Sequence, residues 1–216
     1  EKPVIFRTFF QGLFLQIVLA THNRGKMEEM AQILAHLPVT LLTLDSFPEI
    51  GDIPEPGESL KENAFIKAET VHRLTGLPAL ADDTGLEVDA LNGAPGVHSS
   101  RYAGEDATFE DNCRKMLSEL DGLPMVERTA RFRTVIAFVT KEEKEWTEGV
   151  AEGLILDHKQ GDGGFGYDPI FYYPPLKKTF AELEKTEKNS ISHRGKALRN
   201  FSEILEKRIQ SFTRQT

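Results

Sequence analysis

The chain has 216 residues, of which 39% are hydrophobic and 28% are charged, and its formal net charge is −8. This size suits one domain, or one domain with two lobes, that buries a full core. No apolar run approaches the roughly 18 residues of a membrane-spanning helix, and the negative charge disfavours a nucleic-acid partner. The single cysteine, Cys113, excludes an internal disulfide and fits a reducing cytoplasm. We therefore expect a cytoplasmic protein with neither a membrane nor a nucleic acid as partner.

The first fifteen residues match no clear pattern. Aromatic and aliphatic residues are interrupted by Arg7 and Gln11, and no cleavage site of small residues follows. We therefore treat residues 1–15 as a leader or an artificial extension and residues 16–216 as a single domain.

Strand-like and helix-like patterns alternate through the rest of the chain. The run Ile17–Ala20 predicts a buried strand, and apolar residues then recur at the helical spacing from Met27 to Leu37. Because helices and strands are interspersed, we expect a mixed sheet flanked by helices. The further expected elements are strands at 39–44, 78–81, 129–140, 146–156 and 170–173, an acidic loop at 47–57, and helices opened by Ser59, Thr108 and Ser192.

Polar residues fill the turn between the first strand and the first helix. A turn of this kind directs backbone N–H groups and the positive end of the helix dipole at an anion. Thr21 and Asn23 have side chains that can donate to phosphate oxygens. Gly25 permits close approach of the chain, and Lys26 supplies a positive charge. The alternative is an ordinary capped helix with a solvated lysine, and this segment alone does not decide between them.

Two aspartates, Asp82 and Asp83, follow the strand expected at 78–81. Carboxylates near a phosphate-binding turn suit Mg²⁺, which takes hard oxygen ligands and leaves positions for water and substrate phosphates. Neighbouring residues of a strand point to opposite faces, so one aspartate alone enters a given cleft easily, although a turn at Thr84-Gly85 would bring both close. The alternative is a plain turn that ends the strand. Glu55, in the acidic loop, is a candidate second ligand.

Residues Gly161–Gly166 contain a literal G-x-G-x-x-G pattern. A dinucleotide-binding loop must follow a strand and open a helix, whereas here a strand is expected next. Phe165 and Tyr167 would instead stack on a base, with Asp168 accepting hydrogen bonds from its edge. The alternative is a glycine-rich hairpin with aromatic residues in the core.

Several cations stand in the first turn of the last expected helix, at Ser192–Lys196. Cations there are electrostatically unfavourable, and local violations of this kind occur at functional sites. An anion or a purine carbonyl group would offset the cost, and a solvated basic turn is the alternative.

Together these segments resemble the inosine/xanthosine triphosphate pyrophosphatase family. The likeness covers roughly residues 16–210 in the right order, and several long blocks matched collinearly are highly specific. The matching blocks are Leu19–Lys26, Glu62–Ala64 with Lys67 and Ala68, Ala81–Gly96, Ser99–Arg101, Gly164–Pro169 and Ser192–Leu198.

The resemblance implies an α/β fold, in which an elongated mixed β-sheet flanked by helices forms two lobes around a central nucleotide-binding cleft. It also implies a homodimeric enzyme that uses Mg²⁺ to hydrolyse the purine nucleoside triphosphates ITP, dITP and XTP. The products would be the nucleoside monophosphate and pyrophosphate, and the reaction would cleanse the nucleotide pool.

The functional residues of the family transfer to matching positions of this sequence. Asp83 is the implied proton acceptor and, with Glu55, an implied Mg²⁺ ligand. Thr84 stands where the family usually has serine, and it keeps the hydroxyl group of that substrate contact. The implied phosphate-binding residues are Thr21, His22, Asn23, Arg24, Gly25, Lys26, Lys67 and Lys188, and the implied base-binding residues are Phe165, Gly166, Tyr167, Asp168, His193 and Arg194.

Arg194 also offers a reason for base choice, because hypoxanthine and xanthine carry a 6-oxo acceptor where adenine has an amino donor. Guanine shares the 6-oxo group, so its rejection needs a further clash.

Two other functions compete with this one. A pyrophosphatase for pyrimidine triphosphates is disfavoured by the segments 165–168 and 192–196, and a sensor without hydrolysis by the presence of Asp83, Glu55 and Lys26. A P-loop kinase or ATPase is excluded because no glycine lies five residues before Gly25 and Met27 replaces the metal-binding hydroxyl residue.

Overall fold

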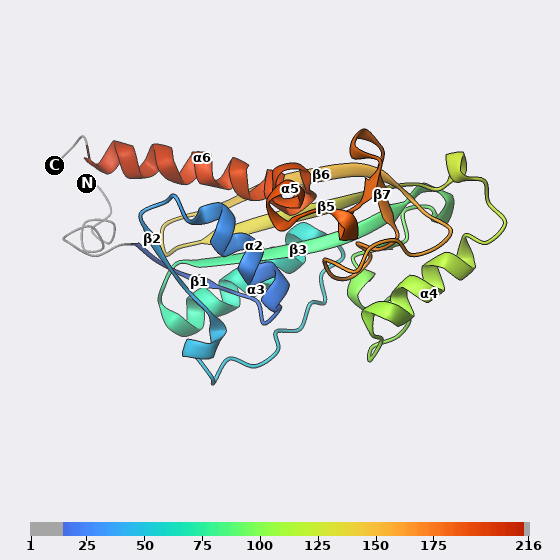
Figure 1. Ribbon diagram of the computed structural model, residues 1–216. Coiled ribbons are helices and arrows are strands. Elements are labelled where there is room, and N and C mark those ends of the chain that lie inside the picture. The colour runs from blue at the N-terminus through green and yellow to red at the C-terminus, as the bar shows by residue number, and fades with distance from the viewer. Residues whose placement is uncertain (1–14, 214–216) are drawn as a thin grey trace. The chain divides into compact units, whose positions relative to one another are not determined.

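The computed structural model describes residues 15–213, and residues 1–14 and 214–216 lie outside the described part (Figure 1). The prediction for residues 1–15 therefore falls outside it except for Leu15, which is buried and begins strand β1 (Leu15–Leu19). The described chain divides into two compact units. Unit 1 holds the chain up to Asp83, Val135–Thr147 and the chain from Ala197, and unit 2 holds Thr84–Thr134 and Glu148–Lys196.

The described residues form an eight-stranded sheet in the order β2-β1-β3-β5-β6-β7-β8, with β4 paired to β3. Strand β1 is parallel to β2 and β3, whereas the pairs β3–β4, β6–β7 and β7–β8 are antiparallel. The predicted mixed sheet is confirmed. After β1 the strands are β2 (Val39–Leu42), β3 (Ala79–Val88), β4 (Pro95–Gly96), β5 (Thr129–Val139), β6 (Lys144–Ile155), β7 (Phe171–Tyr173) and β8 (Lys178–Thr179).

Side-chain caps begin three of the helices. Asn23 accepts a hydrogen bond from the backbone N of Lys26, Ser59 accepts one from Glu62, and Thr108 forms a capping box with Asp111. The helices predicted from Ser59, Thr108 and Ser192 are confirmed. The α-helices are α2 (Arg24–Leu34), α3 (Leu60–Thr75), α4 (Phe109–Glu119), α5 (Lys185–Ile191) and α6 (His193–Thr213). Among the helices that the structure describes, none combines the length and apolar character required to cross a bilayer.

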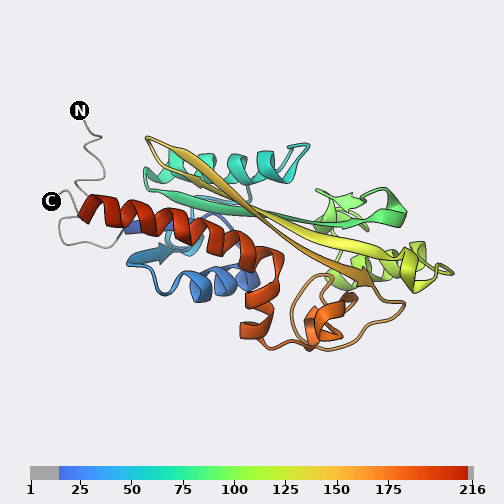
Figure 2. The same cartoon turned by 90° about the horizontal axis from the view of Figure 1, so that it is seen from above.

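In unit 1, helices cover both faces of the sheet, with α2 and α3 on opposite sides of the strands (Figure 2). One face carries a buried cluster in which Ile17 and Leu80 pack with Met30 of α2 and Phe201 of α6. The strand residues that alternate with Ile17 and Leu80 point to the opposite face of the sheet. That face lies on the side of α3, where Ala64, Ala68 and Val71 are buried.

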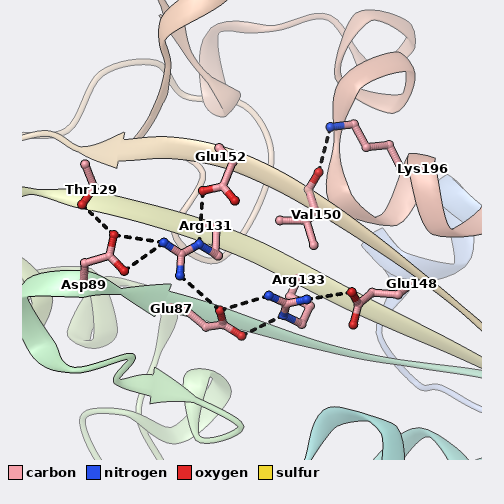
Figure 3. Close-up of polar contacts among 9 residues, drawn as sticks. All are labelled: Glu87, Asp89, Thr129, Arg131, Arg133, Glu148, Val150, Glu152 and Lys196. Atoms are coloured by element: carbon pink, nitrogen blue, oxygen red, sulfur yellow. Dashed lines mark hydrogen bonds and ion pairs between the residues drawn. The ribbon is translucent and has the colours of Figure 1, made fainter.

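In unit 2, the core cluster includes Phe132, Phe171 and Phe180 together with Cys113 and Met116 of α4. The other face of β5 carries Arg131 and Arg133, which form ion pairs with carboxylates of the neighbouring strands β3 and β6 and, for Arg131, with Asp89 just beyond β3 (Figure 3). The Nε of Arg133 lies 2.9 Å from Glu87 Oε1, and its Nη1 lies 2.7 Å from Glu148 Oε1. Unit 2 therefore has one apolar face of its sheet and one face built from paired charges.

Strand β3 is longer than the sequence indicates. The expected turn at Thr84-Gly85 is wrong, because both residues lie within a strand that continues to Val88. Leu86 and Val88 are fully buried, and Leu86 and Glu87 pair with Gly96 and Pro95 of β4. Burial and pairing of this second half outweigh the turn propensity of Asp and Gly.

Candidate active site

The turn between β1 and α2 is fixed by its own side chains. Thr21 Oγ1 accepts a hydrogen bond from the backbone N of Asn23 at 3.1 Å, and Asn23 Oδ1 accepts one from Lys26 N at 3.1 Å. The predicted sequence of strand, polar turn and helix start is therefore present. His22 and Arg24 are exposed, and His22 Nε2 lies 3.4 Å from the carbonyl oxygen of Gly51.

The two aspartates of β3 contact different lysines. Asp82 Oδ2 lies 3.2 Å from the Nζ of Lys26, which belongs to α2. Asp83 Oδ1 lies 3.4 Å from the Nζ of Lys67, which belongs to α3. Because α2 and α3 lie on opposite sides of the strands, the pleat of β3 explains this division. Asp82 is fully buried and Asp83 nearly so.

Lys67 also contacts the acidic loop, since its Nζ lies 2.9 Å from Glu55 Oε2. Burial raises the pKa of Asp83 above its ordinary value; Glu55 and Asp82 act in the same direction, and Lys67 and Lys26 oppose it. Burial alone would lower the pKa of the Lys67 ammonium, but the combined attraction of Asp83, Asp82 and Glu55 raises it. Unit 1 thus holds a nearly buried carboxyl group with an elevated pKa beside an ammonium group that stays charged.

Glu55 and Asp83 have the donor chemistry for Mg²⁺, because both are carboxylates that converge on one cationic group. Within residues 15–213, no group of three or more His, Cys, Asp or Glu side chains is arranged to hold a metal ion. The pair therefore fits a Mg²⁺ site only where water and substrate phosphates supply the remaining ligands, which is the usual manner of binding this ion.

In unit 2, Asp168 holds the glycine-rich loop together. Its Oδ2 accepts hydrogen bonds from the backbone N of Phe165 at 2.9 Å and from Lys188 Nζ at 2.7 Å. Gly164 and Gly166 have positive φ angles of 71° and 63°. A Cβ on Gly164 would lie 2.1 Å from Asp168 Oδ2, so the loop requires glycine there.

Two cations lie near the ring of Phe165. The Nζ of Lys188 lies 4.7 Å and the guanidinium carbon of Arg194 lies 5.6 Å from its centroid. Arg194 is 1% exposed, and its Nη2 donates to Thr84 Oγ1 at 3.2 Å. The ring of His193 stacks on Phe132 at 4.5 Å. Lys188, which the resemblance assigns to the phosphates, thus lies with the residues assigned to the base.

Tyr167 differs from Phe165 in its surroundings. Tyr167 is buried, its hydroxyl donates to the carbonyl oxygen of Ser99 at 2.8 Å, and burial raises its pKa. Phe165 is partly exposed. Of the two rings expected to stack on a base, Phe165 is therefore the accessible one, and Tyr167 fixes the loop to the core.

The basic start of α6 is paired with its surroundings. Ser192 Oγ accepts a hydrogen bond from Gly195 N at 3.1 Å, and Lys196 Nζ donates to the carbonyl oxygen of Val150 at 2.7 Å (Figure 3). Thr21–Lys26, Glu55, Lys67 and Asp83 belong to unit 1, whereas Thr84, Phe165–Asp168, Lys188, His193 and Arg194 belong to unit 2.

Sequence reasoning missed two neighbours of these residues. Thr134 of β5 is buried, and its Oγ1 lies 2.6 Å from Thr84 Oγ1. Phe109 of α4 lies 6.3 Å from Phe165, measured between ring centroids. No sequence motif marks either residue. Thr134 is one member of an alternating strand, and its contact with Thr84 follows only from the pairing of β5 with β3.

Comparison with known proteins defines the class of the chain. The model of the Ham1 family matches residues 17–204, and the chain belongs to this family. The solved structures that share its fold include a HAM1 protein from Coxiella burnetii (46% identity, 89% of this chain and 99% of that one, TM-score 0.82) and the Ham1 protein of Staphylococcus aureus (39% identity, 89% of this chain and 99% of that one, TM-score 0.81).

Its curated relatives include a dITP/XTP pyrophosphatase of Geobacter sulfurreducens, which is 51% identical over 85% of this chain and 92% of that protein. Another, from Desulforamulus reducens, is 50% identical over 88% and 96%. These relatives confirm the recognised family and the expected class of enzyme, a hydrolase of the nucleoside triphosphate pyrophosphatase type.

Proposed function

We propose that the chain hydrolyses the non-standard purine nucleoside triphosphates ITP, dITP and XTP to the monophosphate and pyrophosphate, with Mg²⁺, and so cleanses the nucleotide pool. The observation that carries the proposal is the position of the Lys67 ammonium within 2.9 Å of Glu55 and 3.4 Å of Asp83. Cations beside a carboxylate pair suit a polyphosphate held together with a divalent ion. The names of the relatives support the choice of substrates.

In this proposal the unit 1 residues bind the triphosphate. The backbone N–H groups at the start of α2, with Lys26 and Lys67, contact phosphate oxygens. Glu55 and Asp83 would hold Mg²⁺, which supplies neutralisation of phosphate charge. Asp83 accepts the proton of the attacking water; because a carboxylate bound to Mg²⁺ is a weaker base, the neighbouring Asp82 assists where Asp83 acts as a metal ligand.

The unit 2 residues bind the base. The partly exposed ring of Phe165 stacks on the purine, and Arg194 donates to its 6-oxo group. Adenine presents an amino donor at that position, so two donors would face each other. The pair Asp168–Lys188 keeps the loop of Phe165 in place.

We test the reaction with ITP, XTP, GTP, ATP and dTTP, with and without Mg²⁺, and identify the products by anion-exchange chromatography. We expect pyrophosphate and monophosphate, formed only with Mg²⁺, and a preference for ITP and XTP over ATP. Release of orthophosphate, or equal turnover of ATP, would contradict the proposal.

The variant Asp83→Asn tests the role of Asp83. The amide cannot accept the proton, so we expect turnover of ITP to fall by about 10²–10⁴-fold while nucleotide binding persists in calorimetry. Asp89→Asn, in the exposed ion pairs of β5, is the matched control and should leave turnover unchanged. Undiminished turnover in Asp83→Asn would remove this assignment.

We also propose a cytoplasmic homodimer, from the family resemblance and the lone cysteine. Sedimentation equilibrium of the purified chain tests the assembly, and a mass of one chain across the concentration range would contradict it.

A further inference from the structure

A chain of two hydroxyl groups leads from the core of unit 2 to Arg194. Thr134, on β5, is fully buried, and Thr84 lies on the neighbouring strand β3. Their Oγ1 atoms are 2.6 Å apart, a normal length for a hydrogen bond between hydroxyl groups. Thr84 Oγ1 in turn lies 3.2 Å from Nη2 of Arg194.

The chemistry of these groups fixes the direction of one bond. A guanidinium group has only donors, so Thr84 Oγ1 accepts from Arg194. The bond between the two threonines can run in either direction, and in both cases it holds the Thr84 hydroxyl in one rotamer. The bond to Thr134 therefore helps to keep the Thr84 hydroxyl directed at the guanidinium.

Arg194 contacts both Phe165 and Thr84. The ring of Phe165 lies beside its guanidinium at 5.6 Å, and Thr84 accepts from its Nη2. A guanidinium recognises a carbonyl group through the fixed directions of its N–H bonds, so its orientation determines how well it distinguishes an acceptor from a donor. Any group that fixes Thr84 therefore also affects this distinction.

We propose that Thr134 is a positioning residue for base selection: through Thr84, it holds the Arg194 guanidinium in the orientation that favours a 6-oxo purine over a 6-amino purine. The inference rests on the proposed function, in which Arg194 contacts the base. Thr134 itself does not contact the substrate.

The variant Thr134→Val removes the hydroxyl and keeps the branched shape. We expect kcat/KM for ITP relative to ATP to fall about three- to tenfold, the net contribution of one hydrogen bond, mainly through a higher KM for ITP. Thr134→Ser keeps the hydroxyl and should restore most of the ratio. A double-mutant cycle with Thr84→Val tests whether Thr134 acts through the Thr84 hydroxyl. If it does, Thr134→Val should have no further effect on the ITP-to-ATP ratio once that hydroxyl is gone.

A matched control separates positioning from stability. Thr140 is a buried threonine just beyond the same strand, and its Oγ1 accepts from Glu142 N and Glu143 N. Thr140→Val should lower the melting temperature and leave the ITP-to-ATP ratio unchanged. If Thr134→Val does not fold, Thr134→Cys, whose thiol is a weaker partner, carries the same test.

The outcomes distinguish the two proposals. A wild-type enzyme that does not prefer ITP over ATP contradicts the proposed function, whatever the variants do. A wild-type preference that Thr134→Val retains within twofold overturns the role of Thr134 alone. An equal loss of preference in Thr140→Val, or additive effects in the double-mutant cycle, also overturns it.

Discussion

Asp82 and Asp83 are adjacent residues with different surroundings. The alternation of side chains along a strand predicts that these two aspartates point to opposite faces of the sheet. In the structure, Asp82 forms an ion pair with Lys26 and Asp83 forms one with Lys67. The identity of each lysine could not be predicted, because it depends on which helix covers which face. The contact between Lys188 and Asp168, which are 20 positions apart, could not be predicted either, because it also depends on how the elements pack.

Cys113 makes a pH-dependent contribution to stability. Burial raises the pKa of its thiol from 9.0 to about 11 in the folded state. Between these pH values the unfolded chain loses the proton first, so the folded state binds more protons and the free energy of unfolding falls as the pH rises.

Cys113→Val removes this proton linkage. We therefore expect urea denaturation to show a smaller loss of stability from pH 8.5 to 10.5 in the variant than in the wild type. Tyr102 and Tyr167 also have raised pKa values and are present in both proteins; burial is the main cause for each, and Cys113 adds only to the shift of Tyr167. Parallel pH profiles for the two proteins would contradict this assignment.

At the scale of elements, the junction between α5 and α6 depends on Gly195. A Cβ on this residue would lie 1.9 Å from the carbonyl oxygen of Asn189, which is backbone and cannot rotate away. Gly195→Ala should therefore lower the free energy of unfolding by about 1–3 kcal/mol or more, despite the helix propensity of alanine.

Gly51→Ala is the control for this prediction, because nothing lies within 4 Å of a Cβ built there. It should change stability by less than about 1 kcal/mol. Thermal and urea denaturation of both variants provide the comparison, and equal stabilities would show that the junction adjusts without strain.

We expect the ion pairs of β5 to contribute little to stability. Arg133 is 29% exposed and pairs with Glu87 and Glu148, so solvent screens both interactions. We expect Arg133→Gln to cost about 0.5–1 kcal/mol at low salt and less in 0.5 M NaCl. Arg114→Gln, at a more exposed pair, should cost less still. A loss that salt does not reduce would indicate a packing role for the Arg133 stem.

The helices with local start signals were predictable, because a cap such as Ser59 lies next to the helix it begins. Helix α5 was not predicted. Two of its seven residues, Lys188 and Asn189, are buried polar residues, which give no apolar period. The second half of β3 was also missed, since its pairing with β4 is a tertiary contact. Local chemistry thus predicted where elements begin better than where they end.

For the whole molecule, β3, β5, β6 and α6 each contribute residues to both units. Unfolding of one unit therefore breaks elements that continue into the other, and we expect a single cooperative transition. The sequence provides separate probes, because the one tryptophan, Trp146, lies in unit 1 and the four tyrosines lie in unit 2.

Tryptophan fluorescence and tyrosine absorbance, followed through the same urea titration, should give coincident midpoints. An earlier midpoint for the tyrosines would show that unit 2 unfolds independently.

The interleaved order of the segments also limits how such a protein can be rearranged. No continuous piece of the gene encodes either unit alone, since residues 135–147 of unit 1 interrupt unit 2 and residues 84–134 of unit 2 interrupt unit 1. A hybrid that exchanges one unit between two relatives would need splice points inside strands as well as in the last helix. Recombination at a single crossover therefore always mixes the units.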